Sequence, residues 1–227
     1  MTYTVRILPS GREMRVEARE TLLEAALRQG LNFPYSCRDG TCATCKGRIV
    51  EGEIDPGHYQ PSALSEEERQ AGYALFCVSK PQSDLVVEIR EIDSVKDIPV
   101  KTIPVRVTRI EDLAPEVRAV FLKTPASERL QFLAGQYVDI LLKNGQRRSF
   151  SLASSPLNDE YLELNIKHID GGEFTTHVFQ SMHEKEILRI RGPLGTFFLR
   201  QDGERPIIML ATGTGFGGST AGAFSSF

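Results

Sequence analysis

Apolar and polar positions alternate along residues 3–8 and again along residues 13–18, with a Pro-Ser-Gly turn between them. Successive side chains of a strand point to opposite faces, so this alternation predicts a β-hairpin. Thr21 and Glu24 then have the spacing of a capping box, and an apolar stripe follows them. The stripe predicts a helix over residues 22–29.

The next stretch, residues 35–47, has no apolar period and is rich in Cys, Gly and small polar residues. We therefore expect a loop, followed by a short strand. Ser65 and Glu68 repeat the capping-box spacing and predict a second helix, which Gly72 can end. With a last strand over residues 85–89, these elements predict a small β-grasp domain.

The second half of the chain begins after residues 93–102, which mix charged residues with proline and predict a linker. Beyond it, closely spaced short runs broken by Gly, Pro and Asn predict an antiparallel barrel or sandwich. These expected strands cover residues 105–110, 117–123, 137–142, 149–153, 161–168 and 187–191. A helix is expected to begin near Thr175 and to turn Val178 and Phe179 inward. The apolar run 206–211 is typical of a buried parallel strand.

Composition narrows the class of protein further. The chain has 227 residues, of which 41% are hydrophobic and 25% charged, with a formal net charge of −3. This is the composition of a globular protein without a basic field for nucleic acid. No apolar run approaches the roughly 20 residues of a membrane span, and the N-terminus lacks the apolar core of a signal peptide. We therefore expect a cytoplasmic protein, in which clustered cysteines bind metal rather than form disulfides.

The four cysteines have an informative spacing. Cys37, Cys42 and Cys45 follow the pattern C-x4-C-x2-C, and Cys77 comes from a distant segment. This spacing is that of a plant-type [2Fe–2S] cluster, and the small residues between the ligands allow the backbone to approach it closely. The alternatives are a structural zinc site and unligated buried thiols. Zinc sites usually use paired C-x2-C knuckles, which this chain lacks, so the spacing favours the cluster.

Several segments share a family resemblance, which extends over nearly the whole chain. They are residues 34–47 around the cysteines, 63–65, 72–77, the Phe-Leu-Ala-Gly-Gln-Tyr run 132–137 and the Arg-Ser-Phe-Ser run 148–151. Together they resemble the ferredoxin-fused flavoprotein reductases, among them the reductase of the CDP-6-deoxyhexose dehydrase and the reductase components of bacterial aromatic oxygenases. Ala43 stands where many relatives have Gly, a change that leaves the ligating cysteines intact.

By this resemblance, residues 148–151 match the flavin signature R-x-[YF]-[ST]. Arg148 would bind the pyrophosphate, Phe150 would cover the isoalloxazine, and Ser151 would be the catalytic position at the flavin N5 edge; Ser149 lies within the same signature. The residue types suit these roles. A guanidinium can donate two parallel hydrogen bonds to a phosphate, and an aromatic ring can stack on the flavin.

A second segment, residues 171–176, resembles the family's glycine-rich turn into a helix whose N–H groups bind the cofactor phosphate. Gly172, Phe174 and Thr175 are its predicted contacts, with Thr175 adding its hydroxyl. Taken singly, each residue favours a simpler interpretation: Arg148 a solvated strand charge and Thr175 a helix N-cap. Taken together in the family's order, these residues favour flavin. FAD is expected, although FMN shares the same contacts.

Two further features have simpler interpretations. His168 and His177 are expected to be ordinary polar positions, because the sequence shows no carboxylate or serine placed to form a catalytic triad with them. Residues 192–198 resemble the family's barrel-closing turn, and a turn followed by core aromatic residues explains them equally well.

Near its end, residues 207–215 resemble the first strand and phosphate loop of the family's NAD(P)H domain, with Thr214 as a candidate contact. Residues 213–218 spell G-x-G-x-x-G, yet a βαβ unit needs about 30 residues. The expectation is a truncated or frameshifted reductase with a loosely docked tail. The expected domains are a [2Fe–2S] ferredoxin domain (1–92), a linker (93–102), an FAD-binding barrel (103–202) and a nucleotide-domain stub (203–227).

The sequence thus predicts an α+β, mainly β, iron–sulfur flavoprotein: an N-terminal β-grasp ferredoxin domain, an antiparallel flavin-binding β-barrel and a stub of an α/β nucleotide-binding domain. By its resemblance to NAD(P)H-dependent oxidoreductases, it would pass electrons from flavin through the cluster to an acceptor protein, a dehydrase or oxygenase component. NAD(P)H feeds the flavin in complete relatives, and its use is expected to be impaired here. The alternative is a ferredoxin-like one-electron carrier without a working flavin or NAD(P)H site. We expect a monomer that binds neither nucleic acid nor membranes.

Overall fold

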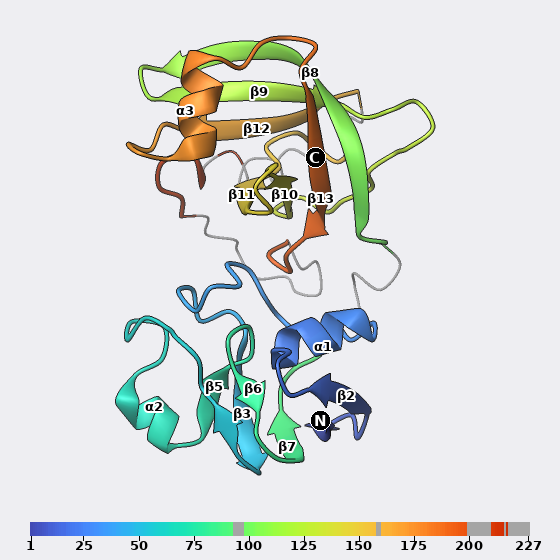
Figure 1. Ribbon diagram of the computed structural model, residues 1–227, viewed down its shortest axis with the longest axis vertical. Helices are drawn as coiled ribbons and strands as arrows, with labels where there is room; N and C mark the ends of the chain where they lie inside the picture. The colour runs from blue at the N-terminus through green and yellow to red at the C-terminus, as the bar shows by residue number, and fades with distance from the viewer. Residues whose placement is uncertain (93–97, 158–159, 199–209, 216, 218–227) are drawn as a thin grey trace, which may run out of the picture. The chain divides into compact units, whose positions relative to one another are not determined.

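The computed structural model of the protein describes residues 1–92, 98–157, 160–198, 210–215 and 217. The chain forms two compact units, Met1–Asp97 and Ile98–Phe227. Figure 1 shows the helices and strands of each unit. Among the described residues, none of the helices has both the length and the apolar character needed to cross a bilayer.

The first unit is built on a five-stranded sheet with the order β2-β1-β7-β3-β5. Its strands are β1 (Thr2–Leu8), β2 (Glu13–Glu17), β3 (Lys46–Glu51), β5 (Tyr73–Leu75) and β7 (Leu85–Glu88). β1 pairs with β7 in parallel and with β2 antiparallel, as the predicted hairpin requires. A second small sheet joins β4 (Ile54–Asp55) to β6 (Lys80–Pro81).

Both predicted capping boxes are present and start the two helices of this unit. At α1 (Leu22–Arg28), Thr21 Oγ1 accepts from the Glu24 N–H at 3.2 Å, and the Glu24 carboxylate accepts from the Thr21 N–H at 3.0 Å. The same exchange between Ser65 and Glu68 starts α2 (Glu66–Gln70). Because each cap satisfies N–H groups that the helix leaves unbonded, the helix starts were readable from sequence.

The second unit is an antiparallel six-stranded sheet with the order β11-β10-β13-β8-β9-β12. Its strands are β8 (Lys101–Ala114), β9 (Val117–Lys123), β10 (Tyr137–Leu141), β11 (Arg147–Ser151), β12 (Leu162–Lys167) and β13 (Ile187–Leu194). A bridge between Leu152 and Leu164 joins the two ends of this order, which closes the barrel. The barrel interior is filled by alternate residues of these strands, for example Val138 and Ile140, both nearly inaccessible. The predicted fold class is confirmed.

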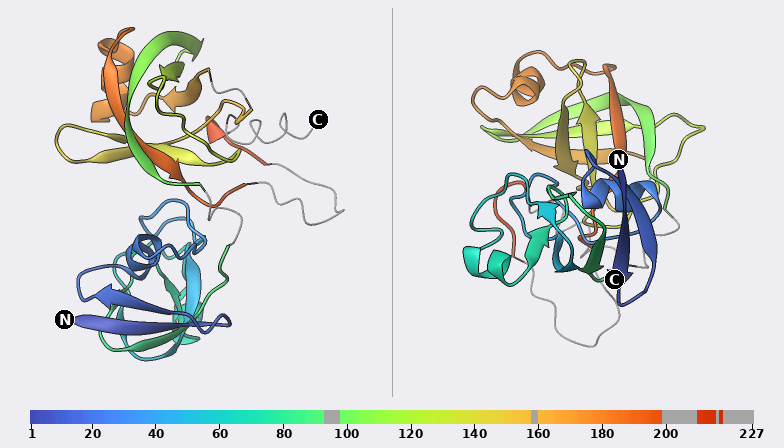
Figure 2. Two further views of the ribbon diagram at one scale, coloured as in Figure 1. Left: turned by 90° about the vertical axis from the view of Figure 1, so that its right-hand side faces the viewer. Right: turned by 60° about the horizontal axis from the view of Figure 1, so that its bottom comes forward.

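The helix of this unit, α3 (Glu173–Gln180), lies beside β9 and β12 (Figures 1 and 2). It is held there by Arg118 of β9, which donates to the Val178 and Phe179 carbonyls at 2.8 and 3.0 Å. Val178 is fully buried, as predicted, and Phe179 packs against the core from a partly exposed position. The helix begins two residues earlier than expected, because Gly172 rather than a hydroxyl residue occupies the N-cap.

Two other differences concern the strands. β8 begins at Lys101, within the stretch expected to be a linker. β13 continues through a Gly-Pro pair to Leu194, three residues beyond the expected end, where Tyr137 of β10 pairs with it. The expected strand over residues 206–211 falls mostly outside the described residues, and the expected stub of residues 203–227 does so except for 210–215 and 217.

Candidate functional site

The segment that carries three of the cysteines is a loop that precedes β3, as predicted. Three of its residues have left-handed backbone conformations: Arg38 with φ 64°, Gly40 with φ 79° and Ala43 with φ 60°. A side chain at Gly40 would not fit, since a Cβ there would lie 2.8 Å from the His58 carbonyl oxygen. Such a run of turns points successive N–H groups toward one centre.

The four cysteines interact as two pairs. Cys37 and Cys42 interact through their thiols, and the Cys37 N–H lies 3.5 Å from Cys42 Sγ. Cys45 and Cys77 form the other pair, in which the hydrogen bond from Cys45 lowers the pKa of Cys77 to about 7. The same bond and burial raise the pKa of Cys45.

Backbone groups complete this cysteine site. The Gly40 N–H hydrogen-bonds the Cys77 sulfur, and Cys42 Sγ lies 3.3 Å from Thr44 Oγ1. Hydrogen bonds of this kind to the sulfurs are what a bound iron–sulfur cluster requires, because they stabilise its negative charge. The residues therefore fit the predicted group.

The two metal groups considered for this site need different arrangements of ligands. A structural zinc site has four ligands around one centre. A [2Fe–2S] cluster takes two thiolates on each of its two irons, and two interacting pairs of cysteines suit it. Within the part of the chain that the structure describes, no three His, Cys, Asp or Glu side chains are arranged to hold one metal ion.

The predicted flavin signature forms strand β11, whose register against β10 determines which side chains share a face. Arg148 lies opposite Ile140, and Phe150 lies opposite Val138. Directly opposed residues of an antiparallel pair point to the same side, so the Arg148 and Phe150 side chains share one face of the strand. The Arg148 guanidinium donates to the Gln146 side chain and to the Arg147 carbonyl, both at 2.8 Å.

The ring of Phe150 meets that of Phe174, the second residue of α3, with 5.5 Å between their centroids. The structure thus brings the flavin signature and the start of the predicted phosphate-binding helix together. Ser151 is exposed at the end of β11, opposite Tyr137. Ser149 points to the other face and donates to the buried carboxylate of Asp139 at 2.6 Å.

At the start of α3, the hydroxyl of Thr175 is engaged with its own turn. It accepts from the Ile169 N–H at 3.2 Å and lies within donating distance of the Ile169 and Gly172 carbonyls. Thr175 is therefore the third residue of the helix, not its N-cap. A Cβ at Gly172 would lie 2.6 Å from this hydroxyl, so the tight turn explains the glycine. The predicted contact between the Thr175 hydroxyl and a phosphate stays a prediction.

Thr214 lies in a turn in which Gly217 N–H donates to its carbonyl at 3.3 Å. A Cβ at Gly217 would lie 2.9 Å from the Ala153 side chain and 2.6 Å from that of Asn165. The turn containing Thr214 therefore packs against β12 and the residues just after β11. A contact between Thr214 and a nucleotide stays a prediction.

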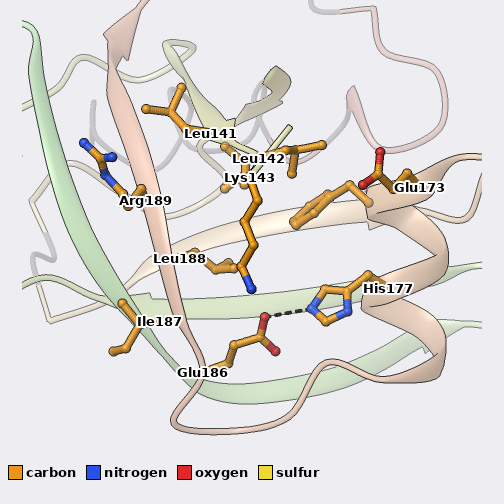
Figure 3. Close-up of a pocket in the computed structure, with 11 residues that line it drawn as sticks. Leu141, Leu142, Lys143, Glu173, His177, Glu186, Ile187, Leu188 and Arg189 are labelled. Atoms are coloured by element: carbon orange, nitrogen blue, oxygen red, sulfur yellow. Dashed lines mark hydrogen bonds and ion pairs between the residues drawn. The ribbon is translucent and has the colours of Figure 1, made fainter. Parts of the chain in front are cut away.

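The interpretation of His177 was wrong in one respect. Its two ring nitrogens lie 2.7 Å from Ser181 Oγ and 2.7 Å from Glu186 Oε1, so a serine and a carboxylate do flank it. Figure 3 shows the contact with Glu186. Ser181 is the C-cap of α3, where the helix dipole is negative and would oppose a developing oxyanion. We therefore interpret the hydrogen bonds of His177 with Ser181 and Glu186 as structural contacts at the C-terminal end of α3, not as a catalytic triad. The i,i+4 spacing of His177 and Ser181 was a signal available in the sequence.

The same histidine borders a cavity of about 700 Å³ between β10, α3 and β13. Lys143 extends into it toward Glu186 (Figure 3). Near its rim, Asn144 of the β10–β11 loop donates to the Glu173 carboxylate at 2.8 Å, which links that loop to the first residue of α3.

Comparison with known proteins assigns the two units. Residues 5–82 match the family model described as 2Fe-2S iron-sulfur cluster binding domain, and residues 104–199 match the one described as oxidoreductase FAD-binding domain. The chain therefore belongs to the ferredoxin-fused flavoprotein reductases, whose two matched domains have a [2Fe–2S] cluster and FAD as their cofactors.

Individual relatives agree. The chain is 37% identical over 216 residues to the CDP-6-deoxy-L-threo-D-glycero-4-hexulose-3-dehydrase reductase of Yersinia pestis, covering 95% of this chain and 64% of that protein. It is 37% identical over 219 residues to the phenol 2-monooxygenase reductase component DmpP of Pseudomonas sp. strain CF600, covering 95% of this chain and 61% of that protein. The chain thus spans less than two thirds of the length of these relatives.

Among solved structures, the chain is similar to the crystal structure of the Amycolatopsis cytochrome P450 reductase GcoB, with a TM-score of 0.77 and 34% identity. The match covers 99% of this chain and 68% of that one. A ferredoxin reductase of carbazole 1,9a-dioxygenase matches with a TM-score of 0.69 and 27% identity, covering 100% of this chain and 68% of that one.

Proposed function

We propose that this chain is the cluster- and flavin-bearing part of an electron-transfer reductase. In this proposal, electrons pass from FAD through a [2Fe–2S] cluster to an acceptor protein, a dehydrase or an oxygenase component. The observation that carries the proposal is the pairing of the sulfurs, Cys37 with Cys42 and Cys45 with Cys77, in a unit that matches a cluster-binding family. A cluster of this type, with a potential of roughly −400 mV, is a strong one-electron donor.

The chain's own residues bind and orient the two groups. Cys37, Cys42, Cys45 and Cys77 hold the cluster, and the loop N–H groups stabilise its charge. On the barrel, Arg148 binds the FAD pyrophosphate together with the first N–H groups of α3. Phe150 covers the ring system, and Ser151 donates or accepts at N5. FAD, when bound, supplies the conversion between two-electron and one-electron transfer.

Thr175 lies in the first turn of α3, and a contact between its hydroxyl and a phosphate stays a prediction. Its hydroxyl holds the turn between Ile169 and Gly172. We propose that it acts on the cofactor through the backbone, by keeping the first-turn N–H groups in place. A Thr175→Val variant would then weaken FAD binding, whereas a Thr175→Ser variant would retain it.

A visible spectrum with iron, sulfide and flavin quantified tests this proposal. We expect two irons, two sulfides and close to one releasable FAD per chain. Cluster absorbance without flavin would support the ferredoxin-like carrier instead. Zinc in place of iron would contradict both.

The acceptor is proposed from the relatives, whose names describe reductases that serve a dehydrase and a monooxygenase. Oxidation of the prereduced chain by purified components of either class, followed by stopped-flow absorbance, tests this part. The expected weakness of NAD(P)H use stays a prediction for the 227-residue chain itself. Steady-state assays with NADH and NADPH and a dye acceptor test it, and turnover equal to that of a complete reductase would contradict it.

A further inference from the structure

Gln136 is a buried amide, 3% exposed, that is bonded at both ends. Its Oε1 accepts from the Leu133 N–H at 2.8 Å, and its Nε2 donates to the Gly195 carbonyl at 3.0 Å. Its own carbonyl accepts from the Leu152 N–H at 3.0 Å. One residue thus joins the loop before β10, the residue after β11 and the turn after β13.

These three segments approach one another through their backbones. Gly135 and Gly195 have φ of 95° and 88°, in the left-handed region that favours glycine. A Cβ at Gly195 would lie 2.7 Å from the Tyr137 ring, and a Cβ at Gly135 would meet the Phe197 carbonyl. Residues 135 and 195 therefore have no room for a side chain where these three segments meet, and the Gln136 amide bridges this junction.

The junction lies directly behind the residue proposed to meet the flavin N5 edge. Tyr137, which follows Gln136, pairs with Ser151 on one side and with Leu194 on the other. Leu152, bonded to the Gln136 carbonyl, follows Ser151 in the chain. The position of Ser151 is therefore fixed from the β10 side, by its pairing with Tyr137 and by the bond from the next residue, Leu152, to the Gln136 carbonyl.

Strand β11 needs such support because it stands at the end of the sheet order, paired along its length with β10. On its other side, the residues just after β11 meet β12 through the bridge between Leu152 and Leu164 and through a bond from the Ala153 N–H to the Glu163 carbonyl at 2.8 Å. A buried amide with both ends bonded is also costly to replace, since its loss leaves a backbone donor and a backbone acceptor unsatisfied. An apolar side chain would fill the space without fixing the geometry.

We infer that Gln136 is a positioning residue for Ser151: it clamps the end of β11 to the turn at Gly195 so that the Ser151 hydroxyl meets N5 of FAD. This inference rests on the proposed function, in which FAD lies on β11. Gln136 itself does not touch the cofactor. It acts through Leu152 and Tyr137.

Two variants separate the hydrogen-bonding role of the Gln136 side chain from its role in filling space. Gln136→Glu keeps the acceptor for Leu133 but replaces the donor to Gly195 by an oxygen, and Gln136→Met removes both bonds at similar size. Gln131→Glu, at an exposed position five residues earlier, is the matched control for the added charge. Each chain is reconstituted with FAD labelled with ¹⁵N at N5, and the N5 chemical shift reports the hydrogen bond there.

In both Gln136 variants we expect the N5 shift to move toward that of Ser151→Ala, while FAD binding weakens about fivefold, as for one lost hydrogen bond. The control and the parent chain should agree. If Ser151→Ala moves the shift and the Gln136 variants do not, or if their barrel unfolds, the inference is wrong and the proposed function stands. If the parent chain binds no FAD, the proposed function itself is wrong.

Discussion

The ring centroids of Phe150 and Phe174 lie 5.5 Å apart, with the ring planes inclined at 47°. Phe150 comes from the strand of the flavin signature and Phe174 from the first turn of α3, 3% exposed. The pair therefore sets the distance between the strand that would cover the flavin ring and the helix N-terminus that would bind its phosphates.

Replacing Phe174 tests this relationship. Phe174→Ala leaves a cavity beneath β11 and should lower the free energy of unfolding of the barrel by about 3–5 kcal/mol. FAD affinity should fall as well. Phe197→Ala is the control, since that ring is 67% exposed and its removal should cost within about 0.5 kcal/mol. Urea unfolding followed by circular dichroism measures both, and equal losses in the two variants would contradict the account.

The hydrogen bond between Ser149 and Asp139 should couple the two strands that carry it. Ser149→Ala leaves the buried Asp139 carboxylate without this donor, which should cost about 1–3 kcal/mol of stability. In a double-mutant cycle with Asp139→Ala, the coupling energy should reach at least about 0.5 kcal/mol. Additive effects in urea unfolding would show that the bond does not hold β11.

The left-handed backbone at Ala43 leads us to expect that a glycine there would stabilise the cluster loop. Its φ of 60° is strained for a residue with a side chain, and Gly relieves this strain by about 1 kcal/mol. Ala43→Gly should therefore slow the loss of cluster absorbance in guanidinium. Ala71→Gly, at the C-cap of α2, is the matched control and should bring no such gain. An unchanged rate for Ala43→Gly would contradict the strain.

Burial raises the pKa of Glu163, next to the end of β11, and the nearby Glu111 raises it further. Because the folded pKa lies above the unfolded one, this carboxyl favours folding in its protonated form and reduces stability as pH rises above about 4. Glu163→Gln should then have a higher melting temperature than the parent at pH 7, and the difference should vanish below pH of about 4. The exposed Glu184→Gln serves as control. A parent chain as stable as the variant at pH 7 would contradict this.

The features predicted from sequence are those that depend on local pattern. The capping boxes at Thr21 and Ser65 set the helix starts within a few residues, and alternation identified the long strands. The strands β4, β5 and β6 were not predicted from the sequence. They have two or three residues each, and whether so short a segment forms a strand depends on the strand it pairs with. The spacing of the cysteines identified their site because three of its four ligands, Cys37, Cys42 and Cys45, are close in sequence.

The interactions around β10 and β11, where the flavin signature lies, could not be predicted from local sequence pattern. Asp139 is a charged residue within an apolar strand, and its partner Ser149 follows only from the register of β10 and β11. Gln136 bonds to residues 16 and 59 positions away, Leu152 and Gly195, and contacts of that kind are set by the closed barrel. Glu186 likewise reaches His177 from another element.

Photoreduction of the bound FAD tests the central claim most directly. With a sacrificial donor under anaerobic light, the chain should develop the electron paramagnetic resonance signal of a reduced [2Fe–2S] cluster, because FAD passes its electrons on singly. A Cys77→Ser variant should show flavin bleaching without that signal. Bleaching in the parent chain while its cluster stays oxidised would contradict the account.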